Sequence, residues 1–475
     1  MAALRRITRR RTIRVAIGGA ASSILLAFLV LLGSGGPAAR AGQAPLVGPL
    51  AVVGNTLVDQ GQGNLPVTLR GVDVLAWTSG PYTNGFVDTD ALDTLVAWGA
   101  NFVRLAISAD QYLHSCGNEA QDPNYDTELA QAVGALTSRG IYTVLDIHSS
   151  NPDCMWSASQ SSVSVPLPGE DTAAALAALV GQFGSNRLVG YEPFNEPQGC
   201  AEADSGLGSS QFVPWTAEPG GWCPDQTEAN LAWDNPGRVE ASSINLLGRW
   251  IGVQSYQAPG MDSLYQTIMG SVPTGAPTPL VFLDANGWAS SGSTFDSMGD
   301  PLAQASNLVQ VFHPYDCQDT SGALSDGHQS AMCQDATPES CSTTSSWIRS
   351  YMADPATGGS WTRPVVFDEF SFPAQEDSYY AHSSTLGKVP ILVYQHGYWV
   401  NNAIAAMQSQ RVGGWAFYYL QNADVSDFQS PYSMLTSGIT ATTPAPWTPN
   451  ANAAPAVSAM EGASLSCENP PLGFG

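Results

Sequence analysis

Positive charge is scarce in this sequence. Its 475 residues include 17 lysines and arginines against 41 aspartates and glutamates, and Lys388 is the only lysine. Seven of the basic residues precede residue 42, where no acidic residue occurs, so the remainder has ten basic against 41 acidic residues, a net charge of −31. Such a surface repels nucleic acid and anionic lipid, and neither is an expected partner. A neutral polymer such as a polysaccharide is unaffected by this charge.

Sequence signatures of several enzyme classes are missing as well. The chain has no Gly-x-Ser-x-Gly elbow for a serine hydrolase and no Gly-x-Gly-x-x-Gly loop for a dinucleotide. It has no Cys-x-x-Cys or His-x-x-x-His spacing for a metal. A Schiff-base aldolase needs a lysine on a barrel strand, and Lys388 lies outside the strands predicted below. We therefore expect neither a metal nor an organic cofactor.

The N-terminal residues have the pattern of an export signal. Six arginines between positions 5 and 14 precede an apolar stretch from Val15 to Leu32, and Ala39-Arg40-Ala41 provides an A-x-A cleavage site. The pattern predicts a signal peptide over residues 1–41 and a secreted, extracellular protein. Because the apolar stretch nearly reaches membrane-spanning length, the alternative is an uncleaved anchor that keeps a fraction of the protein on the membrane. After cleavage we expect no membrane insertion, and we expect a monomer.

The eight cysteines are an even number in a chain expected to be exported, which predicts disulfide bonds. Eight cysteines allow 105 pairings, so the sequence does not determine the connectivity. We favour two loop-to-loop pairs, Cys116 with Cys154 and Cys200 with Cys223.

Apolar runs rich in β-branched residues alternate with helical patterns along the chain. Runs that are hydrophobic throughout predict strands covered on both faces, and their alternation with helices predicts a parallel sheet. Eight strands predict a closed (β/α)8 barrel, the TIM barrel. The predicted strands are Val67–Val74, Asn101–Ile107, Ile141–Ile147, Leu188–Asn195, Leu280–Ala285, Leu308–His313, Pro364–Phe370 and Gly413–Tyr419. The predicted helices are Thr89–Trp98, Asp126–Arg139, Glu170–Phe183 and Val389–Ser409.

The barrel is predicted to occupy residues 42–437 as one domain. Before it, Leu46–Thr68 reads as a short hairpin that caps the barrel floor. Two long insertions, Gln198–Asn235 and Asp316–Ser345, hold five of the eight cysteines and are expected to be tied by disulfides. Residues 438–475 form a tail rich in Pro, Thr and Ala that we expect to be extended, with Cys467 tying its end back.

Two glutamates end two of the predicted strands. Glu196 stands in Asn195-Glu196-Pro197 after one apolar run, and Glu369 ends another. A glycosidase needs one carboxyl group that protonates the leaving oxygen and one carboxylate that meets the developing oxocarbenium carbon. Because catalytic groups of such barrels lie at the C-terminal ends of strands, the two glutamates are candidates for these roles.

Other polar residues at the predicted strand ends complete a pattern. They occur in Asn-Phe-Val-Arg104-Leu, Leu-Asp-Ile-His148, Asn195-Glu196-Pro197, His313-Pro-Tyr315, Asp368-Glu369-Phe and Gly414-Trp415. From about Leu46 to Asn422 the chain resembles glycoside hydrolase family five, the cellulase family, whose eight positions are filled in order. Each motif alone is weak, and the ordered set is specific.

The resemblance implies a role for each position. Glu196 is similar to the acid/base, with a pKa raised by its neighbour, and Glu369 is similar to the nucleophile. Substrate would be bound by Arg104, His148, Asn195, His313, Tyr315 and Trp415. Within that set, Arg104 and Tyr315 would hold the Glu369 carboxylate, Asn195 would bond the sugar 2-OH, and Trp415 would stack on the sugar. The family implies retention of configuration.

The residues alone leave alternatives open. Arg104 could instead be a structural ion-pair partner of Asp73 or Asp146, and Trp415 and the histidines could be core residues. Glu192 has the same strand parity as Glu196, so only the family motif selects between them. Asp146, Asp284, Asp316 and Asp368 are further carboxylates near the same strand ends.

The substrate is less determined than the reaction. Aromatic side chains near the predicted rim could stack along a sugar chain; they are Trp77, Trp156, Trp215, Trp222, Trp288 and Tyr418. The resemblance favours an endo-β-1,4-glucanase, with β-mannanase, β-1,3-glucanase and endoglycosylceramidase-like activity as alternatives. A non-catalytic carbohydrate-binding or cell-wall protein is the alternative of another class, and it would have no need of both glutamates.

Overall fold

The computed structural model describes most of the chain after residue 44. The described residues are 45–77, 89–116, 123–154, 167–197, 212–213, 237–244, 250–290, 292–296, 298, 302–314, 341–371, 380–383, 387–390, 395–418, 420, 434–435 and 444–468. The predicted signal peptide, the Cys200–Cys223 pair, Tyr315 and most of both insertions lie outside them. Among the described residues, no helix is long and apolar enough to cross a membrane.

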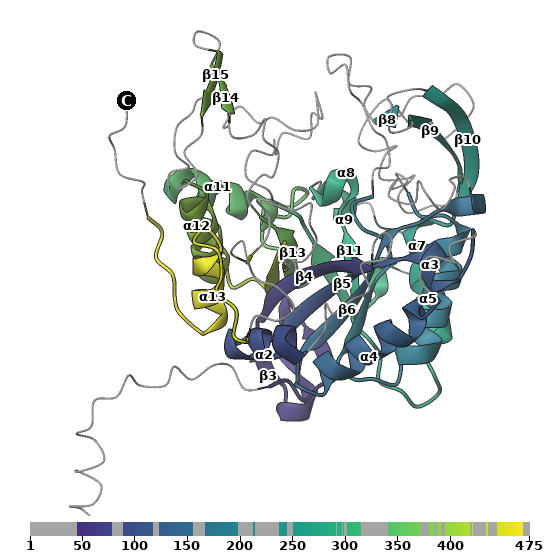
Figure 1. Ribbon diagram of the computed structural model, residues 1–475, viewed down its shortest axis with the longest axis horizontal. Helices are drawn as coiled ribbons and strands as arrows, with labels where there is room; N and C mark the ends of the chain where they lie inside the picture. The colour runs from purple at the N-terminus through teal and green to yellow at the C-terminus, as the bar shows by residue number, and fades with distance from the viewer. Residues whose placement is uncertain are drawn as a thin grey trace, which may run out of the picture. The chain divides into compact units, whose positions relative to one another are not determined.

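Eight parallel strands close into a barrel, as predicted, with helices outside it (Figure 1). Each predicted apolar run overlaps one of these strands, and β4, β5 and β6 extend one to three residues beyond their predicted ends. The spatial order of the strands is β11-β12-β13-β16-β4-β5-β6-β7. Every neighbouring pair is parallel. The strands are β4 (Leu69–Trp77), β5 (Phe102–Ser108), β6 (Tyr142–Ser149), β7 (Val189–Glu192), β11 (Val281–Asp284), β12 (Leu308–Val311), β13 (Val365–Phe370) and β16 (Gly414–Phe417).

The helices pack their apolar faces against the outer side of the strands, and this layer forms the larger core cluster. The predicted helices are observed as α2 (Thr89–Ala97), α4 (Tyr125–Thr137), α5 (Glu170–Phe183) and α12 (Gln395–Gln410). Two further helices, α7 (Gly260–Ser271) and α11 (Cys341–Tyr351), were not predicted. After α4, Gly140 has φ +75°, a conformation that glycine adopts without strain and that does not continue a helix.

Helix α12 begins six residues later than expected. Val389 and Pro390 belong to β15 (Gly387–Pro390), which pairs with β14 (Tyr380–Ser383) as an antiparallel hairpin. The residue before a proline is disfavoured in the helical region, so Pro390 works against a helix that starts at Val389. Lys388 therefore lies in this hairpin and not in a barrel strand.

A small sheet closes the floor of the barrel. It consists of β1 (Leu50–Val53), β2 (Thr56–Asp59) and β3 (Leu65–Val67), one strand more than the predicted hairpin. Asp59 fixes the sheet by accepting hydrogen bonds of 2.8 Å from the backbone N–H groups of Val47, Gly48 and Gly61. The apolar side chains of the floor sheet pack with those in the lower barrel interior and form a second core cluster, which includes Leu57, Leu69 and Phe102.

A second hairpin was also not predicted. It is formed by β9 (Gly237–Ile244) and β10 (Trp250–Ala258), and the short strand β8 (Phe212–Val213) pairs with β9. This hairpin follows the first insertion and precedes α7 (Figure 1).

The described part of the tail contains a packed helix, which corrects the expectation that this part is extended. Residues 444–468, here called the C-terminal strap, contain the helix α13 (Ala454–Met460), which packs on α12. Small apolar residues drive this packing, since Ala456, Ala459 and Met460 are buried. At its start the strap reaches α2, where the Trp447 backbone N–H donates to Thr94 Oγ1 over 3.0 Å.

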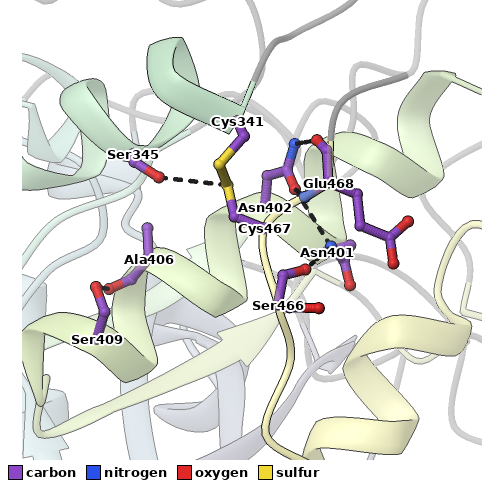
Figure 2. The surroundings of a disulfide bond; sticks show 9 residues. All are labelled: Cys341, Ser345, Asn401, Asn402, Ala406, Ser409, Ser466, Cys467 and Glu468. Atoms are coloured by element: carbon purple, nitrogen blue, oxygen red, sulfur yellow. Dashed lines mark hydrogen bonds between the residues drawn. A yellow bond between two sulfur atoms is a disulfide. The ribbon is translucent and has the colours of Figure 1, made fainter. Parts of the chain in front are cut away.

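A disulfide from Cys341 to Cys467 joins the end of the strap to α11, which confirms that Cys467 ties the tail back. Figure 2 shows how α12 holds the same segment. The buried Asn402 amide donates to the Glu468 carbonyl over 2.8 Å and accepts from the Glu468 N–H over 2.7 Å. The other predicted bond that can be tested, Cys116–Cys154, is present and links the segments after β5 and β6.

Candidate active site

Side chains that point into the barrel change character along the strands. Successive residues of a strand point to opposite faces, so positions two apart share the interior. On β6, Tyr142 and Val144 belong to the apolar cluster of the floor, and Asp146 follows at the same parity. The same step from apolar to polar occurs on other strands and creates a buried polar layer. The polar layer consists of Asp73, Arg104, Asp146, Glu192, Asp284, His313 and Asp368.

Arg104 is the centre of the polar layer. Its guanidinium group donates to Glu369 Oε2 over 2.8 Å and to Asn195 Oδ1 over 2.7 Å. It also contacts Asp73 and Asp146, each at 3.1 Å. Burial opposes its charge, but Asp146, Glu192 and Asp73 raise the pKa of Arg104 well above its ordinary value. Arg104 therefore makes both kinds of predicted contact, the ion pairs with Asp73 and Asp146 and the hydrogen bond to the Glu369 carboxylate.

Glu196 is held at the mouth of the barrel by its backbone as well as its side chain. Its φ of +46° lies in the left-handed region, which is uncommon for a residue with a Cβ. The backbone N–H donates to Asp284 Oδ2 over 2.6 Å, and the carboxylate Oε1 lies 3.0 Å from His313 Nδ1. The side chain remains 16% exposed, so it is accessible from the mouth.

Glu369 lies next to Glu196. One carboxylate oxygen of each glutamate and a ring nitrogen of His313 all lie within 4.8 Å of one another. Retaining glycosidases place their two carboxyl groups about 5–5.5 Å apart, whereas inverting enzymes leave roughly 6.5–9.5 Å for a water molecule. The nearest oxygens of Glu196 and Glu369 are thus closer together than the inverting arrangement requires, in agreement with the retaining geometry.

His313 is buried with a carboxylate on each side. Nδ1 faces Glu196, while Nε2 lies 3.2 Å from Asp368 Oδ1 and 3.6 Å from Asp284 Oδ2. Burial opposes a charge on the ring, but Asp284 and Glu369 raise the pKa of His313 well above its ordinary value, with help from the hydrogen bonds to Asp368 and Glu196.

His148 behaves in the opposite way. Its Nδ1 lies 2.8 Å from Asp146 Oδ2. Burial and the neighbouring Arg104 guanidinium lower the pKa of His148 to about 4, despite the carboxylates nearby. At neutral pH it is therefore an uncharged ring that can exchange hydrogen bonds with a hydroxyl group.

The carboxyl groups divide into two kinds, those whose pKa is raised and those whose pKa is lowered. Burial raises the pKa of Asp73, Asp146 and Asp284 well above the ordinary value, and burial together with Glu192 raises the pKa of Asp368 to about 7. For Glu192, burial has the same direction, but Arg104 outweighs it and lowers the pKa.

Glu196 belongs to the second kind, which corrects the expectation that a neighbour raises its pKa. Burial does raise it, but the hydrogen bond and the charge of His313 outweigh burial and lower the pKa of Glu196 below its ordinary value. The sequence places His313 at a strand end. The protonation of its ring depends on neighbouring carboxylates, chiefly Asp284 and Glu369.

Six of the eight predicted site residues meet at the C-terminal end of the barrel: Arg104, His148, Asn195, Glu196, His313 and Glu369. Tyr315 lies outside the described residues. Glu192, the rival of Glu196, is fully buried and both of its carboxylate oxygens accept from Arg104, so it is part of the support beneath the site.

Trp415 does not reach the site, and its prediction as a sugar platform is wrong. The ring is 1% exposed and packs edge-on against Phe370 in the cluster between barrel and helices. Ala416 occupies the interior position on β16, so strand alternation turns Trp415 outward. Among the rim aromatics, the structure describes the side chain of Tyr418 alone; it is half-buried and stands at the interior parity.

Sequence reasoning named Asp284 and Asp368 only as rival carboxylates and missed their contacts with His313. The strand-end position was a signal for both, but their partners lie on other strands. Within the described residues, two groups could offer a metal ion ligand atoms within 4.8 Å: Glu192, Asp284 and His313, and Glu196, His313 and Glu369. Arg104 already supplies positive charge to Glu192 and Glu369.

A closed parallel barrel with two adjacent glutamates at its mouth defines a barrel of the glycosidase type. The profile of the cellulase family, glycosyl hydrolase family 5, matches residues 61–371, the greater part of the chain and both glutamates. The chain belongs to this family, in which hydrolysis retains the anomeric configuration.

Individual relatives are more distant. Endoglucanase E-5 of Thermobifida fusca is 28% identical over 185 residues, which is 38% of this chain and 34% of that protein. Endoglucanase MaCel5A of Microbulbifer sp. (strain ALW1) is 30% identical over 108 residues, 22% of this chain and 19% of that protein. The chain thus matches 34% or less of the length of these curated relatives. The β-glucanase SdGluc5_26A from Saccharophagus degradans shares the fold at 15% identity, with a TM-score of 0.50 over 89% of this chain and 94% of that one.

Proposed function

We propose that this protein is a secreted, retaining β-glycosidase that cleaves polysaccharide chains, with Glu196 as acid/base and Glu369 as nucleophile. The observation that carries the proposal is the pair of carboxylate oxygens within 4.8 Å at the accessible end of the barrel. A protein that only binds sugars has no need of this pair, whereas double displacement requires it.

In the first step, Glu369 attacks the anomeric carbon while Glu196 gives a proton to the leaving oxygen. Arg104 donates to Glu369 Oε2 and orients this carboxylate. In the second step, Glu196 accepts a proton from water as the oxygen of that water attacks the glycosyl ester on Glu369. Electrostatic preorganisation serves both steps, because the same guanidinium remains in place throughout.

Asn195 is proposed to bind the 2-OH of the sugar in the reacting position. Its Oδ1 accepts from Arg104, which fixes the amide plane and directs the Nδ2 donor away from Arg104. His148, uncharged at neutral pH, contributes a second polar contact. Tyr418, just after β16, provides the aromatic surface for the sugar that Trp415, whose ring is buried, cannot provide.

The proposed substrate is a β-1,4-glucan cleaved within the chain. The names of the two curated relatives, both endoglucanases, support this choice, as does the cellulase description of the family. The β-glucanase of similar fold has been solved with cellotetraose, a soluble fragment of such a chain. Export is supported by the N-terminal pattern and by the disulfides Cys116–Cys154 and Cys341–Cys467.

The test is hydrolysis of a panel by the purified protein and by Glu369→Gln. The panel contains carboxymethylcellulose, mannan, laminarin, xyloglucan and a glycosylceramide, and NMR records the anomer released first. We expect cleavage of carboxymethylcellulose with retention, lost in the variant. Cleavage of another panel member would replace the substrate, release of the inverted anomer would overturn the mechanism, and a folded wild type that cleaves nothing would favour a binding protein.

A further inference from the structure

Three groups from three strand ends form a continuous hydrogen-bonded row beneath the mouth of the barrel. His313 Nδ1 lies 3.0 Å from Glu196 Oε1, and His313 Nε2 lies 3.2 Å from Asp368 Oδ1. Only Glu196 is exposed; His313 and Asp368 are fully buried. The row therefore connects the proposed acid/base to a carboxyl group that water does not reach.

The proton count of this row is informative. A neutral imidazole carries one N–H, so it can donate to one carboxylate only. The carboxyl group on its other side must then donate to the ring, or the ring must be an imidazolium between two carboxylates. In each arrangement the row holds two protons. A shift of both along the row converts Glu196 from carboxylate to carboxylic acid.

We propose that Asp368 is a positioning residue that stores the proton of the acid/base, and that His313 passes this proton to Glu196 when sugar covers the mouth. This inference rests on the proposed function. The Asp368 Oδ1–H bond breaks as an Nε2–H bond forms on His313. The His313 Nδ1–H bond breaks as an O–H bond forms on Glu196. Between the two transfers the ring is an imidazolium held between two carboxylates, in keeping with the raised pKa of His313, and the net result moves the negative charge from Glu196 to Asp368.

Neighbouring groups stabilise the row at Glu196 and at Asp368. Asp284 lies against His313 Nε2 and accepts the Glu196 backbone N–H, so it holds the ring and the glutamate in line. Arg104 Nε lies 3.8 Å from Asp368 Oδ2 and would stabilise the charge that arrives there.

The proton affinities of the row are also in the required order. Burial and the neighbouring Glu192 raise the pKa of Asp368 to about 7, while His313 keeps that of Glu196 low. In the free protein the stored proton therefore resides away from Glu196. Further titratable groups act on the row: Glu369 on the same strand as Asp368, Asp73 across the barrel, Asp146 and His148.

The first experiment compares wild type with Asp368→Asn on two substrates. One is a cello-oligosaccharide, whose leaving oxygen needs a proton, and the other is a dinitrophenyl cellobioside, whose leaving group does not. For the oligosaccharide we expect kcat/KM to fall about 10²-fold and its basic limb to move to lower pH, because Glu196 must then be protonated from solvent. For the dinitrophenyl substrate we expect less than about a tenfold loss.

Asp59→Asn is the matched control, since Asp59 is an equally buried aspartate at the floor of the barrel. We expect it to lower the melting temperature without moving either pH limb. Equal losses of Asp368→Asn on both substrates, with an unmoved basic limb, would show that Asp368 is merely structural and would overturn the proposal.

A second measurement does not depend on activity or on a variant that might be poorly folded. The 15N signals of His313, identified by their loss in His313→Gln, are followed through a pH titration of the wild type. We expect Nδ1 to stay protonated while Nε2 responds to a group that titrates near neutrality, a response absent from Asp368→Asn. A ring that titrates identically in both proteins would overturn the proton store. If the wild type cleaves no panel member but shows this response, the proposed function fails and the proton store stands.

Discussion

The two halves of the barrel interior are equally buried and chemically opposite. The floor half is filled by apolar side chains such as Phe102 and Phe282, whose rings stack with centroids 6.1 Å apart. The mouth half, two residues further along the same strands, contains five carboxyl groups around Arg104 and His313. The same strands therefore carry an apolar environment at the floor and a polar environment at the mouth, and the two are separated by two residues along each strand.

The difference shows what each half contributes. Burial of apolar groups stabilises the fold at about 25 cal/mol per Å². Buried charges contribute little net stability, because desolvation offsets their attraction. The carboxyl groups of the mouth half are thus retained at the expense of stability, and their value lies in orienting Glu196 and Glu369 and in setting the protonation of Glu196. Variants in the two halves should have separable consequences.

The largest effect is expected at the mouth, for Glu196→Gln. The variant cannot protonate the leaving oxygen, so hydrolysis of cello-oligosaccharides should fall by about 10²–10⁴-fold. The melting temperature should change little, because the side chain is partly exposed. Azide in the assay should restore turnover of a dinitrophenyl glycoside and give a glycosyl azide of retained configuration. A variant with wild-type kcat would remove Glu196 from the acid/base role.

At the floor, Phe102→Ala should have the reverse profile. Loss of this fully buried ring should lower the free energy of unfolding by about 3–5 kcal/mol. Denaturant unfolding measures this loss, and kcat at a temperature where the variant is folded should remain near the wild-type value. A large fall in kcat of the folded variant would show that the two halves are mechanically coupled.

Outside the barrel interior, Cys467→Ser frees the C-terminal strap from α11. The bond closes a loop between positions 126 residues apart, and its loss should lower stability by about 2–5 kcal/mol. The measurement is thermal unfolding beside Cys116→Ser, which opens a separation of only 38 residues. We expect the larger loss for Cys467→Ser, and the opposite order would show that the strap is held mainly by its hydrogen bonds.

The smallest effect concerns the pH dependence of stability. Burial raises the pKa of Asp368 from 3.8 to about 7, so between these values the folded protein binds more protons than the unfolded chain. The free energy of unfolding should therefore fall as pH rises from about 4 to 7, and the contribution of this group should be constant outside that window. In Asp73→Asn, one of the carboxyl groups whose pKa is raised by burial is gone, and the fall should be smaller. Melting curves at intervals of pH test this, and equal slopes would contradict it.

The barrel could be predicted from the sequence because its strands are covered on both faces and read as unbroken apolar runs. Helix α11 could not, since Cys-Ser-Thr-Thr-Ser-Ser reads as a loop, and only packing of Trp347, Ile348 and Tyr351 makes it helical. Six site residues could be placed because strand ends converge by topology. Trp415 was wrongly predicted to line the site, because the prediction followed its family motif. The alternation of side chains along β16 would have placed it on the outer face.

The chemistry between the site residues was beyond prediction. The low pKa of Glu196 depends on His313, whose charge depends in turn on Asp284 and Asp368. These three partners lie 88 to 172 positions from Glu196 along the chain. The same holds for Cys341–Cys467, where either cysteine could have paired with several others.

The C-terminal strap also has a consequence for the order of folding. Trp447 bonds Thr94 on the first helix of the barrel, and the carbonyl of Ala459 accepts from Arg70 on its first strand, a separation of 389 residues. The earliest βα unit therefore lacks these final partners until almost the whole chain has emerged. A chain cut short before residue 444 would still have the pairing of β16 with β4 that closes the barrel, but its first strand and first helix would lack the bonds to the strap.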